Sequence, residues 1–340
     1  MRGAVVVAIV LASAAVTHAE PKAIEYQSKA MGTNVHLWIW TDRQEEAAKT
    51  EHDIEVEMKR LDAEMTIWTP DSEISKVIAA AGVKPVKVSD ETIEVVSRAQ
   101  DVSKRSGGVF DITVGAFQGV WKFDQNMDGT LPDPKLVAER LKLVNYKDLI
   151  VDPVKKTLFL RRKGMAITLG GIAKGYAVDK CVAIIKAHGF SDFMFQAGGD
   201  MYIAGTKSGV NWKVGIRDPR GKDGTYFAVA PIQDHSFSTS GDYERGFVKD
   251  GKRWHHILDP RTGFPATASR SVTIRAKDAF TADAWSKVMF IYGWEEGSKI
   301  IAREKLEDFG VAWVDDKNEV HVTPDLQQDL IMLSKPTPGI

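Results

Sequence analysis

Two glycines, a lysine and a third glycine are grouped in the segment TLGGIAKGYAVDK, residues 168–180, where an extended pattern turns into a helical one. Glycine lets a ligand approach backbone N–H groups, and a helix N-terminus adds a partial positive charge. Lys174 would add a full positive charge. This combination suits a phosphate-bearing ligand. The segment matches neither GxxxxGK[ST] nor GxGxxG, so a purely structural turn is the alternative.

Two other turns carry side chains that could take part in chemistry. In QAGGDMYIAG, Asp200 follows a double glycine, where a carboxylate can accept from turn amides, although a plain hairpin explains the pattern too. In WHHILDPRTGFP, His256 lies beside a rigid turn that would hold its ring for general-base chemistry. A histidine hydrogen-bonded within the turn is the alternative. His255 would face the opposite side of a strand.

The segment TADAWSKVMFIYG places Asp283 one helical turn before Ser286 and Lys287. An aspartate with a serine or threonine at i+4 is a plausible all-oxygen site for a hard cation. Here the residue at i+4 is lysine, and a helical Asp–Lys pair is usually a solvated ion pair of little energetic value. The sequence contains no Cys/His cluster typical of zinc and no GxSxG motif.

The elements that must position these residues follow from periodicity and turn signals. Strands occur in clusters between helices, which favours an α+β fold over a doubly wound sheet. Ser72 is the expected N-cap of a short helix, and Gly189 the expected stop of a longer one. We predict strands within 24–40, 148–168, 192–205, 212–219 and 225–275, and helices over 42–65, 89–105, 134–142, 174–188, 280–290 and 295–304.

The chain has 340 residues, 44% of them hydrophobic, and a net charge of −1, which suits a sizeable core and argues against a nucleic-acid partner. Arg2, the run AVVVAIVLASAAV and THA predict a Sec signal peptide over residues 1–19, cut after Ala19. An uncleaved anchor is the alternative. We expect a periplasmic protein with a single domain over 20–340, and a buried thiol at Cys181.

Eight motifs in order resemble the ApbE family, the FAD:protein FMN transferases, from about Lys29 to Gly293: KAMGTNV, SEIS, SGGVFDITVG, GGIAKGYAVD, AGGDMYIAG, STSGDYER, HHILDPRTGFP and ADAWSKVMFIYG. The resemblance implies an α+β fold with two packed subdomains of mixed or antiparallel sheets with helices, and a flavin between them. It also implies that FAD is the substrate. With Mg²⁺, FMN would pass to a Thr or Ser hydroxyl of an exported acceptor protein and AMP would leave. The acceptor would be a subunit of a membrane redox complex.

The resemblance also assigns roles to single residues. His256 would be the catalytic base. Flavin or dinucleotide contacts would come from Met31, Trp68, Val109, Phe110, Asp111, Thr113, Thr168, Lys174 and Ile257. The metal ligands would be the carbonyl of Gly171, Asp283, Ser286 through its backbone, and the residue at position 287.

Three positions depart from the family's pattern. The family usually has Asp at the position of Thr168, often Asn at that of Ile78, and a metal-binding Thr at that of Lys287. A protonated lysine repels Mg²⁺ by about 4 kcal/mol per unit-charge pair at ~4 Å and an effective dielectric near 20. We therefore hypothesise that the Lys287 ammonium replaces part of the metal's charge. The alternative functions are an FAD-binding carrier and an FAD pyrophosphatase with an altered or lost metal site.

Overall fold

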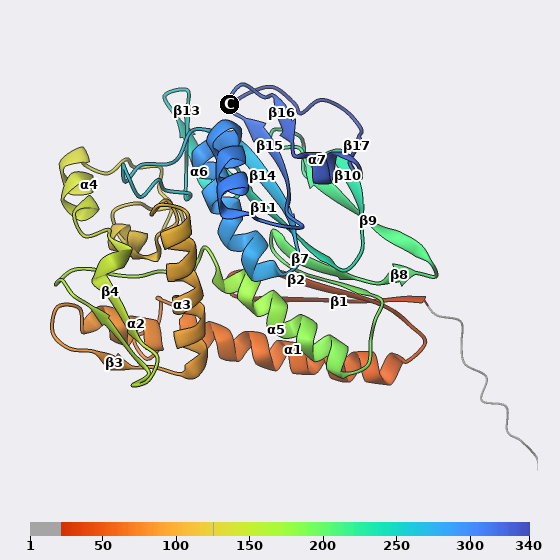
Figure 1. Ribbon diagram of the computed structural model, residues 1–340, viewed down its shortest axis with the longest axis horizontal. Coiled ribbons are helices and arrows are strands. Elements are labelled where there is room, and N and C mark those ends of the chain that lie inside the picture. The colour runs from red at the N-terminus through yellow and green to blue at the C-terminus, as the bar shows by residue number, and fades with distance from the viewer. Residues whose placement is uncertain (1–21, 125) are drawn as a thin grey trace, which may run out of the picture.

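The computed structural model describes residues 22–124 and 126–340, which form an α+β fold with one large antiparallel sheet (Figure 1). Its eight strands follow the spatial order β1-β2-β6-β7-β11-β14-β15-β16, and every neighbouring pair is antiparallel. The strands are β1 (Lys22–Ala30), β2 (Thr33–Thr41), β6 (Phe193–Ala197), β7 (Asp200–Ala204), β11 (His235–Gly241), β14 (Ser269–Ala276), β15 (Gly310–Asp315) and β16 (Val320–Val322).

Strand β2 shows how the sequence divides the two faces of this sheet. Side chains alternate along a strand, so Val35, Leu37 and Ile39 share one face. They are buried in the main core, beneath the long helices. Trp38 and Trp40 lie on the other face and pack against a second, smaller core. The large sheet is therefore covered by protein on both faces.

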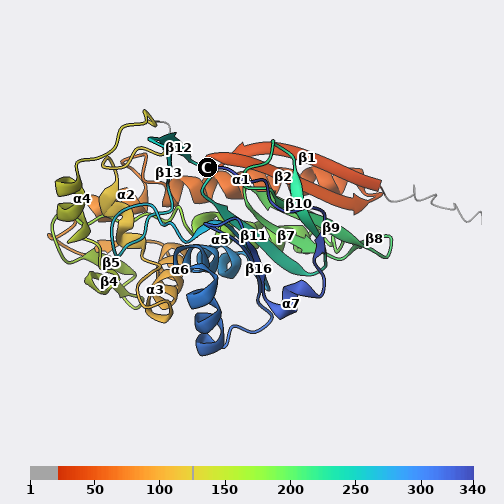
Figure 2. The ribbon, with the colours of Figure 1, turned by 90° about the horizontal axis from the view of Figure 1, so that it is seen from above.

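Three helices cover the face that carries the main core (Figures 1 and 2). They are α1 (Gln44–Met65), α5 (Ala173–Ala187) and α6 (Ala279–Glu304). Helix α5 packs against both of the others. Helix α6 is broken at Gly293, whose φ of 74° and ψ of −178° are not helical, so it consists of the two segments that the sequence predicts.

A four-stranded sheet packs over the other face and encloses the smaller core. Trp212 and Phe227 of this sheet are buried there with Phe237 of β11. The elements of this layer are β8 (Thr206–Lys207), β9 (Val210–Arg217), β10 (Tyr226–Ile232), β17 (Ile331–Met332) and α7 (Pro324–Gln327).

The remaining elements gather at one end of the molecule, at the left of Figure 1. Ser72 and Ser89 cap two of the helices by accepting from Ser75 N and Thr92 N, which confirms the predicted helix starts. The elements are α2 (Glu73–Ala79), β3 (Val86–Lys87), α3 (Asp90–Arg105), the 3₁₀ turns η1 (Ile112–Phe117) and η2 (Tyr146–Asp148), α4 (Pro134–Leu141), β4 (Leu149–Asp152), β5 (Thr157–Leu160), and the hairpin of β12 (Gly246–Lys249) and β13 (Lys252–His255).

The α+β expectation is confirmed, and so is the buried thiol of Cys181. The sequence patterns give no element after residue 304, where the structure has α7, β16, β17 and the fully buried strand β15. The predicted signal peptide, residues 1–19, lies outside the described residues. Within the described part of the chain, no helix combines the length and apolar character that spanning a membrane requires.

Gly175 makes the close contact between α5 and α6 possible. A Cβ at this position would lie against the carbonyl oxygen of Ala279 and 2.6 Å from the Cβ of Asp283. The backbone of α6 cannot yield easily, so any side chain here forces the two helices apart.

We predict that Gly175→Ala lowers the free energy of unfolding by about 1–3 kcal/mol, because it overpacks this helix contact. Urea denaturation monitored by circular dichroism measures the change. Gly170→Ala is the matched control, since its Cβ would meet only the Thr168 hydroxyl, at 3.4 Å. Equal stability of the Gly175→Ala variant and the wild type would contradict this account of the helix contact.

Candidate functional site

Two lysines and two aspartates form a charge cluster where α5, β7 and α6 meet. The Nζ atom of Lys174 lies 2.9 Å from Oδ2 of Asp200 and 3.9 Å from Oδ2 of Asp283. Lys287 forms an ion pair with Oδ1 of Asp283. Both carboxylates are almost fully buried, whereas the side chains of Lys174 and Lys287 are 22% and 17% exposed. The four formal charges cancel, and the cationic side faces solvent.

Neutral donors complete the environment of each carboxylate. The backbone N–H of Gly175 donates to Oδ2 of Asp283 at 2.9 Å, and the hydroxyl of Ser238 donates to Oδ1 of Asp200 at 2.9 Å. Burial acts against the charge of Asp200, but Lys174 and Lys287 outweigh it and lower the pKa of that carboxyl. Burial and the charge of Asp200 raise the pKa of Asp283.

Lys174 carries its charge despite burial. Burial acts to lower the pKa of Lys174, but attraction to Asp200 and Asp283 outweighs it, so the pKa is raised. The residue is in the first turn of α5, whose N-cap residue Ile172 makes no side-chain cap, and the next N–H group, that of Gly175, donates to Asp283. A partly exposed ammonium group beside a helix N-terminus suits an anionic ligand.

The Gly171 backbone borders this cluster. A Cβ at Gly171 would lie 3.6 Å from Cε2 of Phe110 and 4.0 Å from Cε of Lys287. The preceding Gly170 is exposed, and its N–H reaches the Thr168 hydroxyl at 3.3 Å. The glycine-rich segment therefore exposes backbone beside a lysine, as the sequence suggested.

His256 follows the β12–β13 hairpin and is held at its base. Its N–H donates to the carbonyl oxygen of Arg245 at 3.1 Å, and ring atom Nδ1 lies 3.3 Å from the same oxygen. A carbonyl only accepts, so Nδ1 carries the proton and Nε2 is left as the acceptor. Burial, His255, Arg245 and Lys287 lower the pKa of His256, which keeps the ring neutral and links it electrostatically to the lysine cluster.

His255 has a structural role. Its ring is buried, its Nε2 atom lies 2.8 Å from the carbonyl oxygen of Ala266, and it contacts the ring of Phe290 edge-on. The two neighbouring histidines thus bond different carbonyl oxygens, and β13 ends at His255, so the predicted strand does not include His256. Ile257 is buried next to them, and its N–H lies 3.3 Å from His255 Nδ1.

Met31 and Trp68 lie on separate segments, and their assigned flavin contacts stay predictions. Met31 is in the β1–β2 turn with a φ of 51°. The next residue, Gly32, is close to the guanidinium of Arg245, because a Cβ there would lie 3.8 Å from Nη2. Trp68 follows α1 and is 62% exposed, which leaves an indole face free to stack on a ligand.

The Val109–Thr113 segment is mostly packed inside the protein. Val109 and Phe110 are buried in the main core. The carboxylate of Asp111 accepts from the N–H and hydroxyl of Thr113 at 2.8 and 2.6 Å, and from Tyr146 N at 2.8 Å. Burial raises the pKa of Asp111. Asp111 and Thr113 therefore fix the turn η1 beneath the site, and their assigned flavin contacts stay predictions.

The side chains of the residues assigned to magnesium do not offer it a suitable set of donors. Oδ1 of Asp283 bonds the ammonium of Lys287, and Oδ2 accepts from Gly175 N. The Ser286 hydroxyl donates to the Asp283 carbonyl at 2.7 Å and lies 2.7 Å from the Ser240 hydroxyl. Mg²⁺ requires oxygen ligands in near-octahedral geometry, and a positive charge at 287 opposes it. The structure therefore favours the Lys287 ammonium group, rather than a magnesium ion, as the cation bonded to Asp283.

A different group of side chains could hold a metal ion. Among the described residues, the carboxylates and imidazole of Asp315, Glu319 and His321 bring ligand atoms within 4.8 Å of one another. His321 bonds Asp315 at 2.8 Å and stacks on Trp294 at 4.3 Å. No sequence pattern points to this group, because it lies on the segment after residue 304, where no element is predicted.

Sequence reasoning considered Asp200 only as an acceptor from turn amides, and it did not single out Arg245. The double glycine before Asp200 suggested a hairpin whose turn amides bond its carboxylate, but the carboxylate instead bonds Ser238 and Lys174, across the sheet and on α5. Arg245 supplies the carbonyl oxygen that positions His256, and its guanidinium pairs with Asp124 at 2.5 Å. Neither contact is local in sequence.

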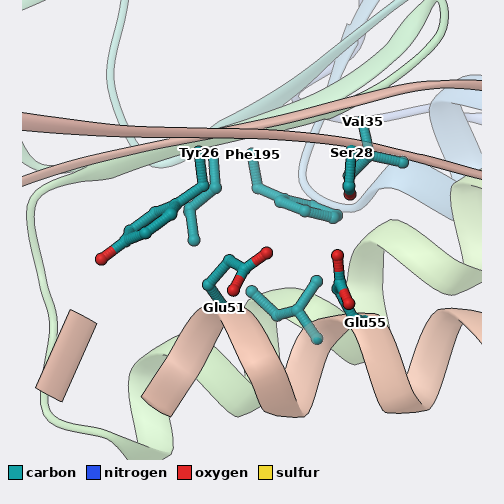
Figure 3. A pocket seen from close by; sticks show the side chains of 8 residues that line it. Tyr26, Ser28, Val35, Glu51, Glu55 and Phe195 are labelled. Carbon is teal, nitrogen blue, oxygen red and sulfur yellow. The ribbon is translucent and has the colours of Figure 1, made fainter. Parts of the chain in front are cut away.

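A small cavity between the large sheet and α1 is too small to hold a nucleotide. Tyr26, Glu51 and Phe195 are among the residues around it, between β1–β2 and α1 (Figure 3). Its volume of about 10 Å³ is no larger than a water-sized probe occupies. Burial and the neighbouring Glu55 raise the pKa of Glu51 there.

Comparisons of the sequence with known proteins identify the family of this chain. The sequence model of the ApbE family matches residues 31–309. This range includes all the site residues named so far except Asp315, Glu319 and His321. This chain belongs to the ApbE family. A relative from Treponema pallidum named "FAD:protein FMN transferase" is 35% identical over 248 residues, which are 68% of each chain. One of the same name from Klebsiella pneumoniae is 28% identical over 87% of this chain and 90% of its own.

Solved structures of this family share the fold. The ApbE protein from Thermotoga maritima is 30% identical with a TM-score of 0.83, covering 91% of this chain and 99% of its own. The flavin transferase ApbE from Vibrio cholerae is 22% identical with a TM-score of 0.80, over the same shares. The ApbE resemblance that the motifs gave is therefore confirmed.

We predict that Asp200→Asn lowers the free energy of unfolding by about 3–5 kcal/mol, because it leaves a buried lysine with less compensation. The double variant Asp200→Asn, Lys174→Met should lose less than the sum of the single variants, since it removes both partners. A double-mutant cycle in urea measures this coupling. Glu296→Gln is the control, because its pair with Lys299 is 55% and 71% exposed. Additive effects of the two substitutions would refute the coupling.

Proposed function

We propose that this protein is a flavin transferase that binds FAD and moves its FMN moiety to a Ser or Thr hydroxyl of an acceptor protein, releasing AMP. The observation that carries the proposal is a neutral, oriented His256 whose pKa responds to the charge of Lys287, a lysine that itself lies next to the Gly171 backbone. Relatives that bear the name FAD:protein FMN transferase support the same reaction.

The transfer has simple requirements. The acceptor oxygen forms a bond to the FMN-side phosphorus of FAD, while the bond from that phosphorus to the bridging oxygen breaks. The electron pair of the broken bond leaves with AMP, and the hydroxyl proton must be taken up. Such phosphoryl transfers depend mainly on positioning and on stabilising negative charge.

The residues of the site meet these requirements. Nε2 of His256 takes the proton, because the N–H of Nδ1 is held against the Arg245 carbonyl and the lowered pKa keeps the ring neutral. Lys174 and the start of α5 face the diphosphate, with the Gly171 corner admitting it close to the backbone. Trp68 and Met31 hold the flavin ring.

The place of action and the partner belong to the same proposal. The leader-like sequence of residues 1–19 supports export to the periplasm. The acceptor is then an exported redox protein, and we propose a subunit of a membrane redox complex. An FAD pyrophosphatase differs only in the nucleophile, because water replaces the acceptor hydroxyl at the same phosphorus.

We predict that Trp68→Ala weakens FAD binding by about tenfold, since a stacked aromatic pair contributes on the order of 1 kcal/mol beyond its buried area. Quenching of flavin fluorescence during titration measures the dissociation constant. Trp294→Ala is the matched control, because this indole is also partly exposed but stacks on His321. Unchanged affinity in Trp68→Ala would place the flavin elsewhere.

We predict that His256→Ala slows FMN transfer by about 10²–10⁴-fold, the usual contribution of a general base. Mass spectrometry of an acceptor domain co-expressed with each variant detects the added FMN, and chromatography quantifies released AMP. His52→Ala, an exposed histidine on α1, is the control and should transfer at the wild-type rate.

Three outcomes separate the candidate functions. FMN on the acceptor with AMP in solution supports the transferase. Free FMN and AMP without labelled acceptor indicate a pyrophosphatase. FAD that stays intact and bound indicates a carrier, and this result would overturn the proposed transfer.

A further inference from the structure

We propose that Lys287 is a built-in cation that fills the position beside Asp283 and the Gly171 backbone, so that this chain transfers FMN without a divalent metal ion there. The inference rests on the proposed function, because it concerns the charge that assists the same transfer. Its first support is geometric: the ammonium of Lys287 bonds Asp283 directly, and its Cε is 4.0 Å from where a Gly171 Cβ would be.

The surroundings hold this ammonium in place. Asp283 is completely buried, and its position on α6 is locked by the close approach of Gly175. Lys287 is one helical turn later on the same face, so its side chain reaches the carboxylate without leaving the helix surface. Its side chain is 17% exposed, which leaves the charge accessible to a bound anion.

The charge count argues against a further cation. Lys174 and Lys287 already balance Asp200 and Asp283. A divalent ion at Asp283 would have to displace the Lys287 ammonium and lie near Lys174, whose Nζ is 3.9 Å from the same carboxylate. With FAD bound, the two ammonium groups instead face the negative diphosphate. Ammonium groups and metal ions are alternative ways to stabilise charge on a transferring phosphoryl group.

Mn²⁺ binding followed by electron paramagnetic resonance tests the cation site without any transfer reaction. Asp315, Glu319 and His321 could also take Mn²⁺, so every variant carries His321→Ala as a common background. In this background, Lys287→Thr should bind one more Mn²⁺ ion than the chain with Lys287, because it removes the ammonium and offers a hydroxyl oxygen. Adding Asp283→Asn to Lys287→Thr should abolish that extra site.

The transfer assay in excess EDTA gives the second measurement. The chain with Lys287 should keep its rate in EDTA. Lys287→Thr should lose about 10²-fold in EDTA, the usual cost of one lost charge-stabilising group, and recover with Mg²⁺. Lys287→Ala should lose a similar factor and recover less, since it supplies no oxygen ligand.

Two results would overturn the proposal: a Mn²⁺ ion bound by the chain with Lys287 and lost on Asp283→Asn, or transfer abolished by EDTA. Absence of transfer in every variant would instead disprove the proposed function. The Mn²⁺ titration would still decide whether Lys287 excludes a metal ion from Asp283.

Discussion

The buried interaction of Lys174 and Lys287 with Asp200 and Asp283 is the constraint on which the rest of the site depends. Each carboxylate would be costly to bury alone, so each has a lysine partner and a neutral donor. The partners come from α5, β7, β11 and α6, and therefore the cluster fixes how two helices sit on the large sheet. Because the lysines are the more exposed members, the site presents positive charge to solvent.

The position of His256 follows from a separate element. The β12–β13 hairpin brings Arg245 and His256 together at its base, and a single carbonyl oxygen sets both the backbone and the ring. The exposed guanidinium of Arg245 extends from the same place toward Asp124 and the β1–β2 turn. The base is thus oriented by backbone geometry, and its neutral state follows from burial and nearby positive charges.

Local signals in the sequence were sufficient for most of the elements. Serine caps at 72 and 89 and the periodic apolar residues of α1 and α3 depend only on neighbours within a few turns. Strand β15 gave no such signal, because its six residues are all buried and show no alternation. The Asp283–Lys287 pair was expected to be a solvated surface pair, but the packing of α5 against α6 buries the carboxylate.

The sequence by itself determined the family, the α+β class, and the identities of His256, Lys174 and Asp283 as candidates for chemistry, since motif order and spacing are properties of the chain. Only the tertiary structure decided that Asp200 bonds Lys174, that the Asp111 carboxylate accepts from Thr113 and Tyr146, and that the Lys287 side chain lies beside Gly171 and bonds Asp283. These outcomes depend on contacts between residues far apart in the chain. Burial and charge compensation act through such contacts, and no local pattern records them.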